Sequence, residues 1–217
     1  MDLDIQEQDN MLEISNVKVY DLKECVIASR NAMRLTPPEY TDEEFEASLP
    51  RAIQLAKCGG GSGHSNFRKG IRVSFDIKYP NYISPEMQRY GFLDIVTSNS
   101  KMHKLVKMNM DCCFNKYVMG ESKEIMKRLI EHYNTMLEYG DKDDIYRAFM
   151  MVISNCPQGI ELFMRCSTNY EQLATIFRQR RHHKLKEDWG AFCQFIKDLP
   201  YSNQLILIGL KDETTDN

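Results

Sequence analysis

The sequence predicts an α+β protein folded as a single domain. Three short segments, around residues 12–20, 71–79 and 160–166, alternate apolar and polar side chains or are rich in residues that favour strands. Between them lie longer segments whose apolar residues recur at the 3.6-residue spacing of amphipathic helices. The chain has 217 residues, 42% of them hydrophobic and 27% charged, which suits one globular domain of ordinary size.

The first quarter of the chain is predicted to be a strand followed by two helices. Residues 12–20 alternate apolar and polar with one slip, which indicates a strand. Asp21 is predicted to cap a helix over residues 22–33. A second helix is predicted over residues 42–57, because Thr41 stands at the cap position and a glutamate three residues later completes a capping box.

A glycine-rich loop follows the second helix. Residues 58–64 read CGGGSGH, and their backbone amides could approach a phosphate. The loop lacks the Lys-Ser/Thr pair of a P-loop and follows a helix rather than a strand, so a flexible connector is the more common meaning of such a run. Residues 71–79 then alternate strictly and predict a half-buried strand that Pro80 stops.

The middle of the chain is predicted to be mostly helical. Residues 84–86, SPE, have the cap, the proline and the acid of a helix start. Residues 97–101, TSNSK, are predicted to be a polar loop before another helix, and they indicate either an anion site or an ordinary cap cluster. Amphipathic helices are predicted over residues 121–139 and 143–153.

The last two predicted helices flank a dense cluster of positive charge. Asn169 is predicted to cap the first of them, and the second covers residues 187–196. Five Lys or Arg and two His lie between Arg178 and Lys186, in a chain whose net charge is −3. These cations either complement the dipole of a solvated helix end, or they bind an anionic ligand, of which phosphate is the first choice.

Composition argues against several classes of protein. The negative net charge disfavours a general polyanion binder, and a nucleic-acid-binding protein that uses residues 178–186 ranks last because interleaved aromatic residues are missing. The seven Cys have no regular spacing and no C-x-x-C pair, so we expect reduced thiols, no disulfide framework and no metal site. The acidic start is not a secretory signal, and no apolar run approaches the roughly 20 residues that span a bilayer.

The C-terminal stretch resembles flavin-dependent thymidylate synthase, the ThyX family. The shared features are a proline turn at Pro157, a short strand, a helix that runs without gaps from Asn169 to Arg180, and a second helix. The resemblance implies that Arg180 contacts and polarises the pyrimidine of dUMP, which makes it the predicted catalytic residue. It implies flavin contacts for Asn169 and Thr175, while Lys184 stands where the family has a flavin-stacking His.

Two N-terminal segments match the same family in the same order. Residues 28–31, ASRN, resemble its early A-x-R-x-S turn, which implies that Arg30 and Asn31 contact the flavin. Residues 63–67, GHSNF, resemble the run G-H-x-S-x-F-E-H before the central strand, so His64 is another predicted cofactor contact. The second His of that run is missing.

The central signature of the family is degenerate in this chain. The motif R-H-R-x-x-S-x-x-x-x-S-x-R-Y falls on residues 89–102, where Arg89 survives and Lys101 stands for the late Arg. Tyr90 and Gly91 replace the family's His and second Arg, and the run S-x-S-x-M-H resembles a divergent branch that is common in phages. The predicted substrate-binding residues are Arg89, Ser98, Ser100, Lys101 and Arg180. The predicted cofactor-binding residues are Arg30, Asn31, His64, Arg89, Tyr90, Thr97, Asn169, Thr175 and Lys184.

The resemblance implies an α+β, ThyX-like fold in which a small antiparallel sheet is combined with a helical bundle. It places this domain at residues 12–200, with residues 1–11 flexible and residues 201–217 as a C-terminal tail. The implied assembly is a homotetramer with shared active sites, without a membrane or nucleic-acid partner, in the cytoplasm (that of the host if the chain is phage-encoded).

The implied reaction is the flavin-dependent transfer of a one-carbon unit to C5 of a deoxypyrimidine monophosphate, by methylation or hydroxymethylation. The implied cofactor is FAD, with methylene-tetrahydrofolate and NADPH as co-substrates. The alternative is a catalytically degenerate nucleotide-binding protein with a regulatory or interaction role. Loss of most of the R-H-R signature favours this alternative, whereas retention of Arg180, Asn169 and the S-x-S-x-M-H run favours the enzyme.

Overall fold

The computed structural model describes residues 11–58, 63–91 and 93–209. Its strands form one antiparallel sheet with the order β1-β2-β4-β3. The strands are β1 (Glu13–Tyr20), β2 (Arg72–Pro80), β3 (Asp94–Ser98) and β4 (Glu161–Asn169). The two longest strands, β2 and β4, lie in the centre and pair with each other over their whole length.

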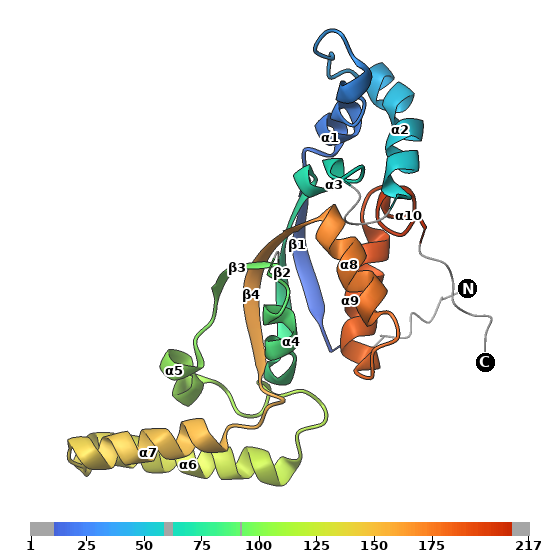
Figure 1. The fold of residues 1–217 in the computed structure, drawn as a ribbon. Helices are drawn as coiled ribbons and strands as arrows, with labels where there is room; N and C mark the ends of the chain where they lie inside the picture. Colours follow the sequence, from blue (N-terminus) through green and yellow to red (C-terminus); the bar gives the residue numbers. More distant parts are fainter. Residues whose placement is uncertain (1–10, 59–62, 92, 210–217) are drawn as a thin grey trace, which may run out of the picture.

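Helices cover one face of the sheet and extend beyond both of its ends (Figure 1). The longer ones are α1 (Leu22–Ala28), α2 (Asp42–Ala56), α6 (Gly120–Tyr139), α7 (Lys142–Asn155), α8 (Tyr170–Arg180) and α9 (Lys186–Asp198). The shorter ones are α3 (Phe67–Gly70), α4 (Ser84–Gln88), α5 (Lys101–Lys104) and α10 (Ser202–Leu205), with 3-10 turns at Asn31–Met33, Asn81–Ile83 and Leu105–Lys107. Within the described ranges, no helix is both long enough and apolar enough to cross a membrane.

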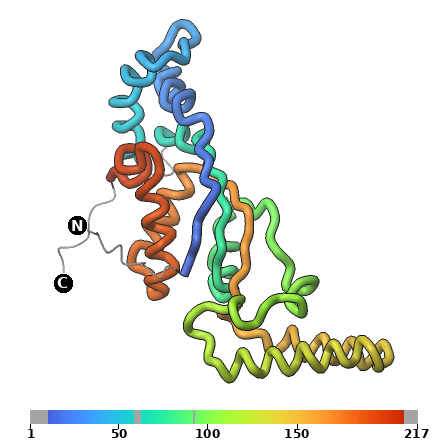
Figure 2. Tube along the Cα trace, turned by 180° about the vertical axis from the view of Figure 1, so that it is seen from behind, coloured from blue at the N-terminus to red at the C-terminus, as the bar shows by residue number. Residues whose placement is uncertain are grey.

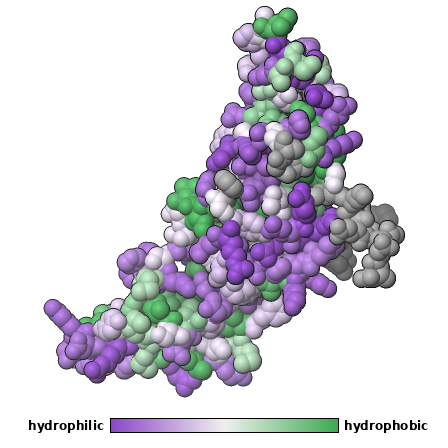
Figure 3. Space-filling view, in the orientation of Figure 1, coloured by the Kyte–Doolittle hydropathy of each residue, from purple (hydrophilic) through white to green (hydrophobic). Residues whose placement is uncertain are grey.

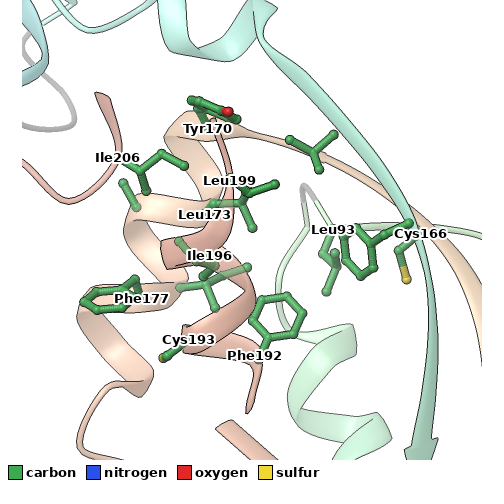
Figure 4. Close-up of a cluster of buried hydrophobic side chains, with 14 of the residues drawn as sticks. Leu93, Cys166, Tyr170, Leu173, Phe177, Phe192, Cys193, Ile196, Leu199 and Ile206 are labelled. Atoms are coloured by element: carbon green, nitrogen blue, oxygen red, sulfur yellow. The ribbon is translucent and has the colours of Figure 1, made fainter. Parts of the chain in front are cut away.

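The main core lies between the sheet and the pair α8–α9. Strand β2 alternates because every second side chain is buried against these helices, and Phe75 is completely buried there. The Phe75 ring packs 4.9 Å from the ring of Phe195 and 5.9 Å from that of Phe192. Figure 4 shows Phe192 and Ile196 of α9 within one apolar cluster that also includes Cys166 of β4. This packing fixes both helices on the sheet.

The start of α8 is fixed by hydrogen bonds and a buried ion pair. The predicted cap is confirmed, because Asn169 Oδ1 accepts a 2.9 Å bond from the backbone N–H of Gln172. Beside it, Arg68 of α3 donates from Nε to Glu171 over 2.7 Å and from Nη1 to the Leu205 carbonyl over 3.0 Å. Residues 202–205 form α10, and Leu205 is fully buried in the core.

Among the described residues, no helical layer covers the opposite face of the sheet (Figure 1). Polar residues of β2 point to this side, among them Asp76 and Lys78, and Phe163 of β4 is 62% exposed there. Figure 3 shows a mostly hydrophilic surface with apolar side chains gathered over β3, where Val96 is 63% exposed. The sheet therefore has a buried face and an open face, as an antiparallel sheet allows.

The hairpin α6–α7 projects away from one end of the sheet, as the views from the two sides show (Figures 1 and 2). It has a small core of its own in which Met126 and Val152 are completely buried, together with Leu105 and Ile160. The amphipathic spacing of residues 121–139 and 143–153 predicted these helices, and both are confirmed.

Two local predictions are wrong. Asp21 does not cap α1, because its backbone is left-handed, at φ 58°, and its side chain accepts no cap bond. The helix also ends at Ala28 rather than near residue 33, where a separate 3-10 turn covers Asn31–Met33. The predicted loop of residues 97–101 begins inside β3, which exists because it pairs with β4 across about 70 residues of sequence. Most of the glycine run and residues 1–10 lie outside the described residues.

Candidate functional site

A cavity of about 730 Å³ lies on the open face of the sheet, beside β3 and α5. Three of the predicted site residues, Thr97, Ser98 and Ser100, line it. The other lining residues are Asp76, Asn99, His103, Lys104, Met108, Phe163, Met164 and Arg165. Its volume is within the range of small-molecule sites, and its wall combines one exposed aromatic ring with hydroxyls and cations.

The wall of this open-face cavity is built by local pairing at the end of β3. Asn99 continues the ladder, because its backbone N–H donates to the Phe163 carbonyl over 3.1 Å and its Oδ1 accepts from the Phe163 N–H over 2.9 Å. The chain then turns into α5, where the Lys104 N–H donates to the Ser100 carbonyl over 3.0 Å. These bonds place Ser98, Asn99 and Ser100 in the same cavity wall.

One cation of this cavity is held by a carboxylate. Arg165 Nη1 donates to Asp76 Oδ1 over 3.1 Å and to the Asn16 carbonyl over 3.0 Å. Hydrogen bonds from Asn16 and from Arg165 hold the pKa of Asp76 below its ordinary value. Arg165 is therefore oriented along the sheet, while the exposed His103 and Lys104 close the cavity from the α5 side.

Arg180 lies on the other side of the sheet, at the end of α8. Its Nη1 donates to Glu86 Oε2 over 2.9 Å, and its Nε donates to Tyr90 Oη over 2.7 Å. The guanidinium lies 4.5 Å from the centre of the Trp189 ring and 5.5 Å from that of Tyr90. Only 13% of the Arg180 side chain is exposed. The predicted catalytic residue is therefore oriented by one carboxylate and two aromatic rings.

Glu86 is the common acceptor of this cluster. Trp189 Nε1 donates to Glu86 Oε2 over 2.8 Å, and His183 Nε2 lies 3.5 Å from the same oxygen. Tyr90 is 8% exposed and donates to Gln179 Oε1 over 3.0 Å. A cavity of about 360 Å³ opens beside the cluster, and its lining residues are Arg180, Arg181, His182, His183, Lys186 and Gly190.

A third cavity, of about 480 Å³, lies near the start of α9 and includes the predicted cofactor residue Lys184 in its wall. Its buried acid is Asp188, which accepts bonds of 3.0 and 3.2 Å from the Tyr82 hydroxyl. Burial raises the pKa of Asp188, and the nearby Asp188 carboxylate adds to burial in raising the pKa of Tyr82. The Glu187 carboxylate also lines this cavity.

The remaining predicted residues lie apart from these cavities or have structural roles. Arg30 donates from Nη1 to Glu44 and to the Ala47 carbonyl, beyond the end of α1. Thr175 donates to the Glu171 carbonyl inside α8. Four more predicted residues, Asn31, His64, Arg89 and Lys101, line none of these three cavities.

The sheet separates the predicted site residues into two groups. Thr97, Ser98 and Ser100 lie on its open face, whereas Tyr90, Arg180 and the α8–α9 junction lie on the helical side (Figure 1). The predicted flavin residues are divided as well: Thr97 lines the open-face cavity, whereas Lys184 lines the cavity near the start of α9. In addition, Tyr90 stands where the R-H-R motif has its His. Its hydroxyl donates to Gln179 and accepts from Arg180.

Sequence reasoning missed four residues that define these sites. Glu86 was visible only as the acid of a helix start, and Trp189, the single Trp of the chain, only as an apolar residue of α9. Phe163 and Arg165 belong to a predicted strand, and their alternation with buried neighbours is the signal that places them on its exposed face. Which face remains open cannot be known from that alternation alone.

The fold is that of ThyX proteins. A ThyX flavin-dependent thymidylate synthase from Helicobacter pylori, solved with FAD and dUMP, superimposes with a TM-score of 0.62 at 17% identity, over 88% of this chain and 98% of that one. A second structure of ThyX from that organism, with the same ligands, gives a TM-score of 0.59 at 17% identity, over 93% and 99%.

A UMP/dUMP methylase, PolB from Streptomyces cacaoi bound with 5-Br dUMP, gives a TM-score of 0.54 at 11% identity, over 85% of this chain and 89% of that chain. No protein-family model matches the sequence, and no curated protein sequence matches it. The chain is therefore a divergent protein with the ThyX-like α+β fold, which confirms the predicted fold class.

Proposed function

We propose that this protein transfers a one-carbon unit to C5 of a deoxypyrimidine monophosphate that binds in the open-face cavity. One observation carries the proposal: Thr97, Ser98 and Ser100, selected from sequence alone, line one cavity of about 730 Å³ in a chain with the ThyX-like fold. The exposed ring of Phe163 offers a base a stacking surface. Arg165 and Lys104 offer charge-assisted bonds to a phosphate.

The proposed site is shared between chains. Arg180 lies on the helical side of the sheet and the open-face cavity on the other, so a site that uses both must combine two copies of the protein. A homotetramer of the kind that the resemblance implies meets this requirement. Arg180 would then polarise the pyrimidine carbonyl of a nucleotide bound to its neighbour, with its guanidinium already oriented by Glu86 and Tyr90.

The proposed cofactor is FAD, with methylene-tetrahydrofolate as one-carbon donor and NADPH as reductant. When bound, the flavin would supply the redox chemistry of the transfer. Two of the predicted flavin residues, Thr97 and Lys184, line different cavities, so a flavin that contacts both would lie between two chains. The residues of this chain bind and orient the nucleotide.

A test of the shared site uses two inactive variants. Ser98→Ala with Ser100→Ala removes the hydroxyls of two residues that line the open-face cavity, and Arg180→Ala removes the polarising group. Each variant alone should lack dUMP methylation or hydroxymethylation in the presence of FAD, methylene-tetrahydrofolate and NADPH. Chains carrying the two lesions, mixed under conditions that exchange subunits, should regain activity because some sites then contain both intact groups.

The control is light scattering, which should show an oligomer for wild type and for each variant. Activity that never returns on mixing, although the subunits exchange, would show that both groups act within one chain. A monomer in solution would exclude the shared site altogether. If the purified protein remains colourless after incubation with FAD, it does not bind the flavin, and FAD is not its cofactor.

A second function, nucleotide binding without catalysis, is favoured by the state of Arg180. Its positive charge already faces the Glu86 carboxylate over 2.9 Å, and Tyr90 occupies a position where the family has a cation. Calorimetry separates the two functions. Binding of dUMP that is weakened by the Ser98→Ala and Ser100→Ala changes, without turnover in any mixture that contains FAD, would identify a regulatory nucleotide-binding protein.

A further inference from the structure

We propose that the cavity near the start of α9 binds a 2-aminopyrimidin-4-one ring, the ring edge that guanine and pterins share. This α9 cavity is separate from the open-face cavity of the proposed reaction, and its volume of about 480 Å³ is within the range of small-molecule sites. Its wall combines two tyrosine rings with a buried acid and a buried amide, which are Asp188 and Asn115.

Asp188 supplies the acceptor side of this site. The residue is 2% exposed, and its donors within the described part of the chain are its own backbone N–H and the Tyr82 hydroxyl, at 3.0 and 3.2 Å from the two oxygens. Two hydrogens do not fill a carboxylate, which has about four acceptor positions. Burial raises the pKa of Asp188, and further N–H donors from a ligand would compensate for that burial.

Asn115 supplies the donor side of the site. It is 5% exposed, and its Oδ1 accepts from the backbone N–H of Tyr117 over 3.1 Å. Among the described residues its Nδ2 group has no acceptor, although Asn115 lines the cavity. An unused N–H group on a buried amide costs free energy unless an acceptor enters the cavity. One cavity therefore contains a buried acceptor and a buried donor, and both have capacity for a ligand.

Gly159 holds Asn115 at this wall. The Asn115 backbone N–H donates to the Gly159 carbonyl over 2.9 Å. A Cβ atom at position 159 would lie 2.8 Å from Asn115 Oδ1 and 2.5 Å from Val118 Cγ2, so a glycine is needed where these two segments approach each other. The donor is thus fixed by backbone contacts on both sides of its amide.

The charges and rings of the wall favour a flat, neutral ligand. The charged residues that line the cavity are two lysines and two acids, so their formal charges sum to zero: Lys184, Lys186, Glu187 and Asp188. A balanced wall attracts neither a phosphate nor an ammonium group strongly. The rings of Tyr82 and Tyr117 offer surfaces against which an aromatic ligand can pack.

The combination of acceptor and donor selects one kind of ring edge. A 2-aminopyrimidin-4-one ring presents an amino group, a ring N–H and a carbonyl in a row, so Asp188 can accept from the first two and Asn115 can donate to the third. Uracil and the flavin ring present a carbonyl on each side of the N–H, and one of these oxygens would face the carboxylate without a hydrogen between them. Guanine and pterins therefore fit this cavity better than dUMP or FAD.

Calorimetry on the full-length protein tests this with two pairs of compounds. Guanosine monophosphate and inosine monophosphate differ only in the 2-amino group, and lumazine is pterin with that group replaced by a carbonyl. We expect saturable binding of guanosine monophosphate or of pterin, and binding of its partner compound weaker by about tenfold or more, because a bond to the carboxylate is lost. The pair that binds more tightly identifies the source of the ring. No binding by either pair, or equal binding within a pair, would overturn the proposal.

Three variants test which residues read the ring edge. Asp188→Asn replaces one acceptor oxygen by a donor and should abolish the preference for the 2-amino compound. Glu187→Gln is the matched control, because Glu187 lines the same cavity but is engaged with Tyr117 over 2.6 Å and Lys116 over 3.3 Å, and the preference should remain. Asn115→Asp still accepts from the Tyr117 N–H but loses its donor, and it should weaken binding of the 2-amino compound by about tenfold.

A purely structural role of Asp188 predicts a different result, because the Asp188→Asn variant would then weaken both members of a pair equally. That outcome would contradict the proposal, as would tight binding of FAD, lost in the same variant, without binding of either pair. The proposed one-carbon transfer is tested separately, because binding of dUMP at the open-face cavity depends on Ser98 and Ser100. Either proposal can fail without the other.

Discussion

The two ends of α8 each carry an arginine–glutamate pair, and the pairs differ in how completely they are enclosed. At the start of the helix, Arg68 and Glu171 have side chains 3% and 15% exposed, and Arg68 also bonds to the Leu205 carbonyl. At its end, Arg180 and Glu86 are 13% and 26% exposed and border a cavity. The same two chemical groups therefore form a buried structural pair at the start of α8 and a partly exposed pair beside a cavity at its end.

The difference follows from what surrounds each arginine. Desolvation by burial lowers the pKa of Arg68, and its charge is tolerated because Glu171 and a backbone carbonyl satisfy it. Arg180 instead lies between aromatic rings, which support a guanidinium while leaving its edge accessible. Enclosure thus distinguishes a structural ion pair from one that belongs to a candidate site.

The largest expected effect comes from breaking the enclosed pair. Arg68→Ala removes the guanidinium that neutralises the Glu171 carboxylate and donates to the Leu205 carbonyl, and it should lower the free energy of unfolding by about 3–5 kcal/mol. Urea denaturation measures it. Arg72→Ala is the control, since the Arg72 side chain is 43% exposed and its pair with Asp94 spans 3.5 Å. Equal losses in both variants would contradict the distinction drawn between enclosed and accessible pairs.

A smaller effect on stability is expected at the open end. Arg180→Ala removes one ion pair and the contact with Trp189 and should lower the free energy of unfolding by about 1–2 kcal/mol. The same variant should lose methylation or hydroxymethylation of dUMP, because Arg180 is the proposed polarising group. A loss of stability as large as that of Arg68→Ala, with this activity retained, would make Arg180 a structural residue like Arg68.

The smallest effect concerns the buried acid at the start of α9. Because burial raises the pKa of Asp188, the folded state binds this proton more tightly than the unfolded state. Its contribution to stability is therefore fully present below the ordinary Asp pKa of about 3.9 and is lost as pH rises through the folded pKa. Asp188→Asn should remove this loss, so the variant gains stability relative to wild type as pH rises above about 4.

Urea denaturation between pH 4 and pH 8 checks this sign. The control is Glu187→Gln, because hydrogen bonding from Tyr117 lowers the pKa of Glu187 and its contribution must be lost as pH falls instead. An Asp188→Asn variant that becomes less stable than wild type with rising pH would mean that the Tyr82–Asp188 bond outweighs the burial of the charge.

Local features of the fold could be predicted from the sequence because they depend on residues close together along the chain. The caps at Thr41 and Asn169 and the alternation of β2 are confirmed, since a cap bond spans three residues and strand alternation has a period of two. The same reasoning failed at Asp21, where the backbone turns left-handed before α1. It also missed β3, which is a strand only because β4 pairs with it.

The sequence by itself determined the α+β class, most of the long helices and the unbroken spacing from Asn169 to Arg180. Only the tertiary structure decided which of the selected residues meet. It brought Glu86 to Arg180 across 94 residues and to Trp189 across 103, and it placed the sheet between Arg180 and the cavity of Ser98 and Ser100. The physical reason is range: hydrogen-bonded turns and periodicity are local, whereas a binding site is formed by side chains that only the packing of sheet and helices brings together.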